Sequence, residues 1–372
     1  MPPVHLLVDQ HIPFIDRLFD DRFLITRFDP DTEPKPEHLE TAEILVIRTV
    51  TKVDQPMLDR APNLKLLCSA TAGYDHIPFD LLKKYRIGAY WSAGCNARSV
   101  AEYVTGAVTV WAEEKQARLE DLSVGIVGAG HAGSATAGLL EKTGCTCLCH
   151  DPPREQRQTG WQGVSVQQIL NCDIISIHTG LDQFPDHPTR DWLDEAKLNS
   201  TKARLIINAA RGGIIDEAAL LSYQRNHSAD FILDTWEHEP QFSAESARQS
   251  WLATPHIAGY SRQSKYRGSA MAAKAICRFF GIEQQIDDFL PPNHQVPEFP
   301  DAQSAGELIR QNHPAFEMHQ KMQEIALEKD SKRRSSLFLK LRVAYPSPDE
   351  WASLSIPKEM IGQYPELSGL IS

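Results

Sequence analysis

The sequence predicts an α/β protein built on parallel sheets flanked by helices. Two observations carry this prediction. Short apolar runs alternate with amphipathic stretches along most of the chain, and one apolar run leads directly into a glycine-rich turn. A chain of 372 residues is too long for one ordinary core, so two or three domains are expected.

The first hundred residues predict the first parallel sheet. Three apolar runs are typical of buried strands, at 5–9, 42–48 and 64–70. Helical patterns are expected at 54–60, 79–85 and 98–115. Strands that alternate with helices pair in parallel, because each helix returns the chain to the same edge of the sheet.

A second series of strands predicts a doubly wound sheet. Six short apolar runs, separated by helical or polar connections, lie at 123–127, 146–149, 173–178, 204–208, 230–234 and 251–255. A proline-rich connector over 290–300 follows. Beyond it, a helical stretch at 315–332 and a strand at 337–343 predict a small third unit with helix and strand.

Composition and charge exclude several classes of function. The chain is 42% hydrophobic and 23% charged, as in globular proteins, and it has no apolar run long enough to span a bilayer. The net charge of −11 argues against nucleic acid and anionic membranes as partners. Seven scattered cysteines favour a reducing cytoplasm over a disulfide framework. We predict no metal site, since Cys145, Cys147 and Cys149 alternate along one strand as packing residues do.

The glycine-rich turn predicts a dinucleotide site. Gly128, Gly130 and Gly133 form a GxGxxG motif between an expected strand and an expected helix. The first glycine permits the tight turn, the second lets a pyrophosphate approach the backbone, and the third lets helix and strand pack closely. The amides of His131 and Ala132 then lie at the helix N-terminus, where the dipole favours phosphate.

An acidic residue at the end of the following strand selects the cofactor. Asp151 is expected to accept hydrogen bonds from the adenosine ribose hydroxyls. Its charge would repel a 2′-phosphate, so the sequence predicts NAD rather than NADP, although Arg154 nearby could soften that preference.

Three ionisable residues each follow a different expected strand, where open α/β sheets bind ligands. Arg211 can bind a carboxylate through two parallel hydrogen bonds, and His256 can exchange a hydroxyl proton. Glu239 can orient the imidazole and stabilise its protonated form. Each residue alone has an ordinary explanation as a surface ion pair, a solvated carboxylate or a structural histidine. Together, beside a nicotinamide cofactor, they predict oxidation of a 2-hydroxy acid or reduction of a 2-oxo acid.

These segments resemble the D-isomer-specific 2-hydroxyacid dehydrogenase family, over roughly residues 4–285. The resemblance lies in segments 208–216, 234–240 and 254–257, which hold the arginine, the glutamate before a proline and the histidine. It implies a Rossmann-type NAD-binding domain, 96–257, inserted into a flavodoxin-like substrate domain, 1–95 with a returning segment 258–285. It also implies four further cofactor contacts, namely Thr179, Ala209, Asp234 and Gly259.

Within the family, segments 48–53, 70–76, 94–97, 149–154 and 256–260 are similar to a subgroup that oxidises 4-phospho-D-erythronate for vitamin B6 synthesis. That resemblance implies substrate contacts from Thr49, Thr71 and Tyr260, and a homodimer formed through a C-terminal dimerisation unit, 286–372. We hypothesise that Arg48 contacts the phosphate. The other basic candidates are Lys52, Arg98, Lys265 and Arg267.

Two alternatives stay open at this point. One is another family member acting on 3-phosphoglycerate, glycerate or a simple 2-hydroxy acid. The other is a non-catalytic, NAD-sensing corepressor-like protein, which can share the fold and the catalytic residues. Turnover separates the second alternative from the enzyme.

Overall fold

The computed structural model describes residues 2–182, 184–287, 290, 302–354, 356 and 362–371. The chain forms two compact units. Unit 1 comprises Met1–Asn96 and Ser261–Pro291, and unit 2 comprises Ala97–Tyr260 and Pro292–Ser372. The proline-rich connector expected at 290–300 lies outside the described residues, apart from Leu290.

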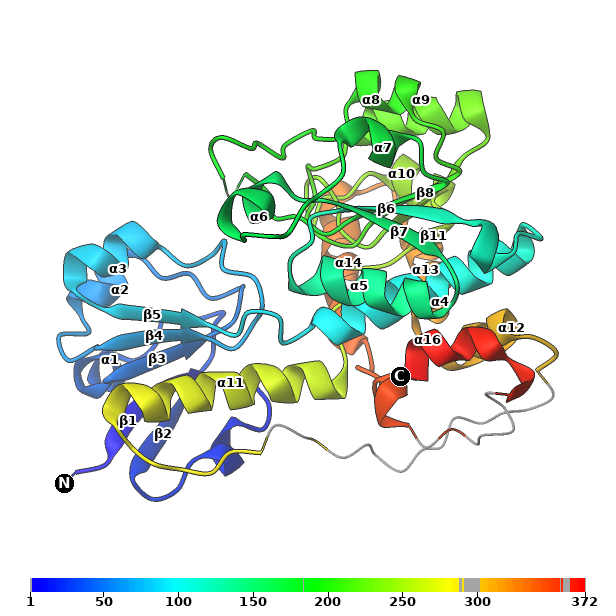
Figure 1. Ribbon diagram of the computed structural model, residues 1–372. Helices are drawn as coiled ribbons and strands as arrows, with labels where there is room; N and C mark the ends of the chain where they lie inside the picture. Colours follow the sequence, from blue (N-terminus) through cyan, green and yellow to red (C-terminus); the bar gives the residue numbers. More distant parts are fainter. Residues whose placement is uncertain are drawn as a thin grey trace. The chain divides into compact units, whose positions relative to one another are not determined.

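Unit 1 is a three-layer α/β unit around a five-stranded parallel sheet (Figure 1). The strand order β2-β1-β3-β4-β5 is that of flavodoxin-like sheets. The strands are β1 (Val4–Asp9), β2 (Phe23–Phe28), β3 (Ile44–Ile47), β4 (Leu66–Ser69) and β5 (Gly88–Trp91). The helices are η1 (Ile15–Leu18), α1 (Pro36–Thr41), α2 (Gln55–Asp59), α3 (Phe79–Tyr85) and α11 (Arg262–Phe280).

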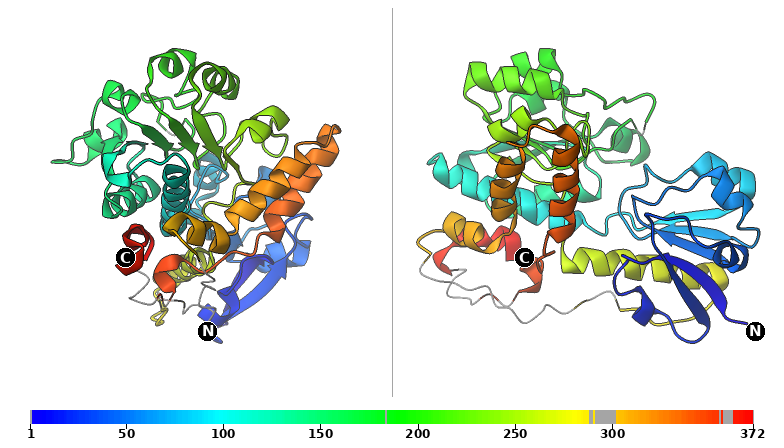
Figure 2. Two further views of the ribbon diagram at one scale, coloured as in Figure 1. Left: turned by 90° about the vertical axis from the view of Figure 1, so that its right-hand side faces the viewer. Right: turned by 180° about the vertical axis from the view of Figure 1, so that it is seen from behind.

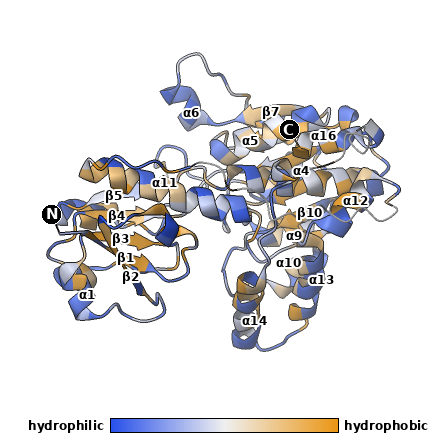
Figure 3. Ribbon diagram, turned by 90° about the horizontal axis from the view of Figure 1, so that it is seen from below, coloured by the Kyte–Doolittle hydropathy of each residue, from blue (hydrophilic) through white to orange (hydrophobic). Residues whose placement is uncertain are grey.

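The two faces of this sheet have separate cores. On one face, Leu6, Val46 and Cys68 pack with residues of α11. On the other face, Leu7 and Leu45 pack with residues of α1, α2 and α3. The strands are correspondingly hydrophobic, while the helices carry hydrophilic residues as well (Figure 3).

Unit 2 contains a six-stranded parallel sheet of order β11-β10-β9-β8-β6-β7. Its strands are β6 (Ser123–Val127), β7 (Thr146–His150), β8 (Ile174–Ile177), β9 (Leu205–Asn208), β10 (Asp230–Leu233) and β11 (Leu252–Ala253). The helices up to β11 are α4 (Ala97–Glu114), η2 (Leu119–Asp121), α5 (His131–Lys142), α6 (Pro152–Arg157), α7 (Val166–Leu170), α8 (Glu195–Ser200), α9 (Glu217–His227) and α10 (Ala244–Gln249). The fold class expected from the sequence, a doubly wound sheet inserted into a flavodoxin-like unit, is thus confirmed.

The C-terminal part differs from the sequence prediction. The strand expected at 337–343 is wrong, because these residues belong to α14 (Ser331–Ala344). Their burial has helical spacing, with Phe338 and Leu341 buried, and Tyr345 just after the helix continues the buried side. The regular elements described here are α12 (Ala305–Asn312), α13 (Ala315–Ile325), α14, η3 (Trp351–Ser353), η4 (Pro365–Leu367) and α16 (Ser368–Ile371).

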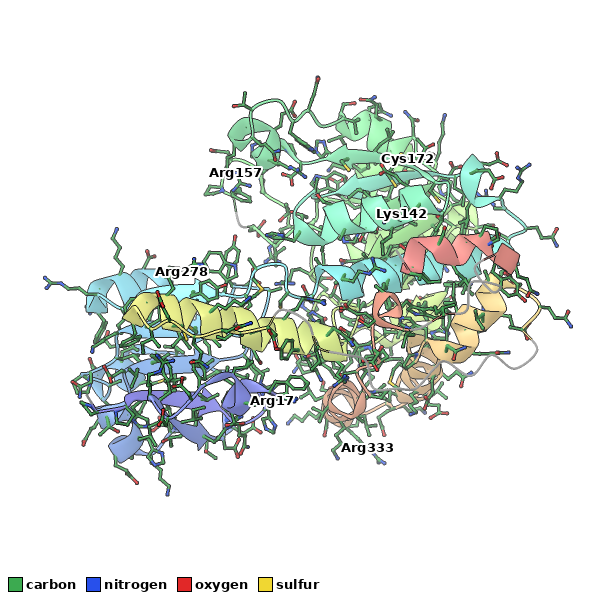
Figure 4. The ribbon with its side chains drawn as sticks, turned by 60° about the horizontal axis from the view of Figure 1, so that its bottom comes forward. Arg17, Lys142, Arg157, Cys172, Arg278 and Arg333 are labelled. Atoms are coloured by element: carbon green, nitrogen blue, oxygen red, sulfur yellow. The ribbon has the colours of Figure 1, made fainter. Side chains whose placement is uncertain are left out.

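The C-terminal segment also does not separate as a third unit, because its residues from 292 onward cluster with unit 2. Helices α13 and α14 form a pair, visible in both views of Figure 2, and their apolar residues join the core of the unit 2 sheet. At the start of α14, Lys332 and Arg333 are exposed, with the Arg333 side chain 74% exposed (Figure 4), whereas Arg334 is half-buried over the Phe242 ring.

Candidate active site

The glycine turn between β6 and α5 has the geometry that its sequence predicts. Gly128 has a φ of +89°, in the region that favours glycine, and a Cβ there would lie 2.7 Å from the Thr179 amide nitrogen. At Gly133 a Cβ would lie 1.9 Å from the Gly128 carbonyl oxygen. Both positions therefore need glycine for the fold itself, and the turn is held against the loop that follows β8.

Gly130 is different, because it has open space where a side chain would stand. A Cβ there would meet no atom within 4 Å, and its φ of −73° suits any residue. Gly130 is the N-cap of the twelve-residue helix α5, so the amides of His131 and Ala132 begin that helix. Unused space beside the positive end of a helix dipole fits the pyrophosphate of a dinucleotide.

Asp151 lies where an adenosine ribose would be recognised. Its Oδ2 accepts a hydrogen bond from the Ala129 amide at 2.9 Å, which joins the end of β7 to the glycine turn. Its Oδ1 accepts from the Arg154 amide at 2.9 Å and caps α6. The carboxylate is thus fixed beside the turn.

Arg154 lies across the same turn. Its guanidinium donates to the Ala129 carbonyl oxygen at 2.6 Å and to Ser134 Oγ at 2.9 Å. The same group lies 4.7 Å from the centre of the Trp161 ring, a stacking arrangement. Arg154 is therefore tied to the loop and to an aromatic ring.

His256 and Glu239 form a hydrogen-bonded pair. His256 Nδ1 lies 2.8 Å from Glu239 Oε2, and the two side chains are 29% and 22% exposed. The other carboxylate oxygen accepts from the Trp236 amide at 2.9 Å. Burial alone would raise the pKa of Glu239, but the charge and hydrogen bond of His256, the Trp236 amide and the charge of Arg342 together lower it. A carboxylate beside Nδ1 leaves Nε2 of the neutral imidazole as the basic atom.

The loop that carries His256 is held by Asp234. This side chain is 1% exposed, and it accepts from Thr254 Oγ1 at 2.6 Å and from the amides of Ile257 and Ala258 at 2.7 and 3.0 Å. Burial raises the pKa of Asp234, against the lowering effect of His256 and these donors. The Tyr103 hydroxyl lies 2.7 Å from Thr254 Oγ1 and extends the network to α4. Asp234, predicted as a cofactor contact, is thus also an anchor for the histidine loop.

The loop after β9 places Arg211 beside the glutamate loop. A Cβ at Gly212 would lie 1.7 Å from the Trp236 carbonyl oxygen, so the two loops are in direct backbone contact. The Asn208 side chain holds the turn, because its Nδ2 donates to the Arg211 carbonyl oxygen at 2.9 Å and its Oδ1 accepts from the Ala210 amide at 3.2 Å. The structure thus gathers the three predicted catalytic residues on neighbouring loops of unit 2.

The remaining predicted contacts are divided between the two units. Ala209 lies in the loop after β9, and Gly259 and Tyr260 lie just before α11 begins. The predicted substrate residues Arg48 and Thr49 follow β3 in unit 1, and Thr71 follows β4.

Arg48 and Thr71 each belong to a polar cluster within unit 1. Arg48 Nε donates at 2.9 Å to Asp9 Oδ2, whose side chain is fully buried, and Thr51 Oγ1 lies 3.3 Å from the same oxygen. Ser69 Oγ lies 2.7 Å from Thr71 Oγ1 and 3.0 Å from His76 Nε2. Thr49 itself is exposed.

The structure also shows the partners of the basic residues that are candidates for binding a phosphate. Lys52 pairs with Asp54, Arg98 pairs with Glu102 in unit 2, and Arg267 donates to the Cys95 carbonyl oxygen. Burial and the nearby charge of Arg48 lower the pKa of Lys265. Lys265 and Arg48 thus act on each other as like charges within unit 1.

Sequence reasoning missed the residues that support the site rather than form it. Tyr103 lies outside the recognised motifs, and Asn208 and Thr254 are the first residues of two of them. All three side chains are buried, and their partners are visible only in the fold. Among the described residues, no three or more His, Cys, Asp or Glu side chains are grouped so as to hold a metal ion. None of the helices in those same parts of the chain is long and apolar enough to cross a membrane.

A site of this kind, a dinucleotide loop with an Arg, a Glu–His pair and a parallel sheet, defines a nicotinamide-dependent dehydrogenase of hydroxy acids. Residues 96–258 match the model of the D-isomer specific 2-hydroxyacid dehydrogenase NAD binding domain. The chain belongs to this family, its cofactor is NAD, and it is an oxidoreductase.

Known proteins narrow the relationship further. The chain is 37% identical over 295 residues to a protein of Marinobacter nauticus named erythronate-4-phosphate dehydrogenase, covering 77% of this chain and 76% of that one. A protein of Pseudomonas putida with the same name is 32% identical over 381 residues, covering 99% and 98%. The solved 3-phosphoglycerate dehydrogenase of Entamoeba histolytica with bound NAD+ is similar in fold, with a TM-score of 0.63 at 22% identity, covering 77% of this chain and all of that one.

Proposed function

We propose that this chain oxidises 4-phospho-D-erythronate to 2-oxo-3-hydroxy-4-phosphobutanoate with NAD, as a step of vitamin B6 biosynthesis. The observation that carries the proposal is the His256–Glu239 pair at 2.8 Å, formed between two loops of the sheet that also bears the dinucleotide turn. The choice of 4-phospho-D-erythronate as the substrate rests on the relatives, which are named for it and match the chain over most of its length.

The proposed chemistry uses the three loops together. Bound NAD supplies the hydride acceptor. Arg211 binds the substrate carboxylate and so orients C2. As the C2 hydrogen leaves with its electron pair, the C2 hydroxyl proton passes to Nε2 of His256 and a C2 carbonyl forms. Glu239 stabilises the imidazolium that results, because its carboxylate stays ionised beside Nδ1.

We propose that the cofactor is held mainly by backbone. The amides of His131 and Ala132, with the space beside Gly130, would bind the pyrophosphate, and Asp151 would bind the adenosine ribose. Gly128 and Gly133 shape the turn. Thr179, Ala209, Asp234 and Gly259 are the further proposed contacts, on the loops that surround it.

We propose that the substrate's other end is recognised by hydroxyls and cations. Thr49, Thr71 and Tyr260 would contact the hydroxyl and carboxylate groups, and Arg48 and Lys265 would bind the 4-phosphate. The effect of Arg48 on Lys265 supports this pairing, because a phosphate dianion would relieve the repulsion between two nearby cations.

The assembly and location are also proposals. We propose a homodimer formed through the C-terminal segment, since Leu339 and Val343 are 46% and 86% exposed one helical turn apart on α14. Light scattering at working concentration tests this, and a monomer would contradict it. We propose a cytoplasmic location, since none of the seven cysteines, all within the described residues, is in a disulfide; fractionation of the producing cells tests it.

The direct test is NADH formation by purified protein with 4-phospho-D-erythronate, 3-phosphoglycerate and D-glycerate. A 2-oxo acid acceptor is included, because tightly held NADH could hide turnover. Clear preference for the four-carbon phosphate is expected. Preference for another acid would overturn the substrate and keep the mechanism, and NAD binding without any turnover would favour the sensor alternative.

The phosphate assignment has its own test. In Lys265→Met, KM for 4-phospho-D-erythronate should rise roughly tenfold, while KM for unphosphorylated D-erythronate stays the same. Lys52→Met is the matched control, because Lys52 is 85% exposed and pairs with Asp54. An equal effect of Lys265→Met on both acids would contradict the assignment.

A further inference from the structure

Helix α14 brings a cation to the catalytic loops. Arg342 lies near its C-terminal end, with the guanidinium carbon 5.5 Å from the centre of the Tyr260 ring. The same charge acts on the Glu239 carboxylate. All of these residues belong to unit 2. A segment far from the catalytic motifs in sequence is therefore adjacent to the site.

The contact is part of a built interface. Phe338 of α14 packs on Phe242 with ring centres 5.4 Å apart, and Phe242 packs on Trp236 at 5.3 Å. The Trp236 amide in turn donates to Glu239. Helix α14 thus lies against the loop that carries the glutamate, and the position of Arg342 is fixed by packing.

One nitrogen of the guanidinium lacks a hydrogen-bond partner in the described part of the chain. Arg342 Nε is buried and has no hydrogen-bond partner among the described residues. An unpaired buried donor costs free energy, so packing alone does not explain an arginine here. Its ring contact and its action on a carboxylate are the interactions that account for it.

We propose that Arg342 is a positioning residue that keeps Glu239 ionised while His256 is neutral, and so fixes the imidazole with Nδ1–H toward Glu239 and Nε2 toward the substrate. Burial favours the protonated carboxyl, and the charge of Arg342 opposes it together with the His256 hydrogen bond and the Trp236 amide. A protonated Glu239 would donate to Nδ1 and leave the proton on Nε2, where it blocks proton transfer.

Other titratable groups face the His256–Glu239 pair and also affect its protonation. Asp234, just after β10, acts on His256 as a negative charge, and it is faced by Tyr103 from α4 and by Tyr345, which follows α14. Burial raises the pKa of both tyrosines, so they stay neutral. Arg342 acts on Glu239 as a cation from outside the glutamate's own loop.

The test is the pH profile of kcat/KM for hydroxy-acid oxidation. In Arg342→Met the acid limb should move up by roughly one pH unit, because the protonated pair no longer faces a like charge. Arg342→Lys should restore most of the wild-type limb. The matched control is Arg334→Met, which removes a cation on the same helix that lies 5.7 Å from the Phe242 ring.

The proposal is overturned if the Met and Lys variants at 342 shift alike, or if Arg334→Met shifts the limb equally. A second readout is the ¹⁵N titration of the His256 imidazole in apo-protein, assigned with His256→Asn. This inference rests on the proposed proton transfer but not on the proposed substrate. Any 2-hydroxy acid that the wild type oxidises serves, so failure with 4-phospho-D-erythronate is distinguishable.

Discussion

The two parallel sheets present different chemistry at their carboxyl ends. In unit 2 these ends carry glycine turns and a Glu–His pair, so backbone amides and one proton-transfer group dominate. In unit 1 they carry charges and hydroxyls that already pair with each other, as Arg48 does with Asp9 and Thr71 with Ser69. The same architecture thus carries the proposed reaction site in one unit and the proposed recognition residues in the other, and the difference lies in side chains and not in topology.

The largest effect that this comparison predicts is on the reaction site. His256→Ala should lower kcat roughly 10³-fold, because it removes the group that takes the proton. Affinity for NAD, measured by calorimetry, should stay within twofold of wild type, since the side chain is not in the dinucleotide turn. Activity near the wild-type value would contradict the proton-transfer role.

On the recognition side, the next largest effect should be on stability. Arg48→Met leaves the fully buried Asp9 carboxylate without its cation and should lower the free energy of unfolding by about 2–3 kcal/mol. Asp9→Asn combined with Arg48→Met should recover part of that loss, because no charge stays unpaired. Urea unfolding measures both variants. Equal stability of Arg48→Met and wild type would show that the pair serves binding alone.

Two glycines of one motif should then separate folding from binding within unit 2. Gly133→Ala forces a Cβ against the Gly128 carbonyl oxygen and should destabilise the protein by about 2 kcal/mol. Gly130→Ala fits the fold and should leave the unfolding midpoint unchanged, while it weakens NAD binding at least about tenfold. The reverse pattern, loss of stability at 130 and retention at 133, would contradict the assigned roles.

The smallest effect concerns acid stability of unit 2. Packing lowers the pKa of His313 to about 4 from 6.5, so the unfolded chain takes up this proton first. The contribution is complete above pH 6.5 and is lost as pH falls toward 4. Because His313 is partly exposed, we expect its contribution to the free energy of unfolding to be about 2 kcal/mol. His313→Asn keeps an acceptor for the Ala315 amide and should flatten this dependence, compared by urea midpoints at pH 7 and 5.

The burial of each strand decided whether the sequence alone could predict it. The fully buried strands β3, β4, β8 and β9, and β6 with only its first residue half-buried, are clear apolar runs in the sequence. The missed strands β2 and β5 are mostly half-buried, so their composition is mixed. The run at 337–343 was mistaken for a strand because α14 is apolar on more than one side, with Leu339 and Val343 exposed and Phe338 and Leu341 buried.

The residues of the site also differ in how far the sequence alone could predict them. Glycines, catalytic residues and Asp151 stand in local motifs, where spacing along the chain carries the information. Arg342 and Tyr103 act through contacts that the fold creates between distant segments. No local pattern marks such residues, because their role depends on which helix packs against which loop.

The stack of Arg154 on Trp161 gives the protein a built-in optical reporter. The indole is partly buried, and its cationic neighbour also donates to the Ala129 carbonyl oxygen of the glycine turn. A ligand that settles on the turn changes the surroundings of that guanidinium, and indole emission responds to a nearby charge. Titration of intrinsic fluorescence, with Trp161→Phe as the blank, would therefore report occupancy of the turn directly, without labels and without turnover.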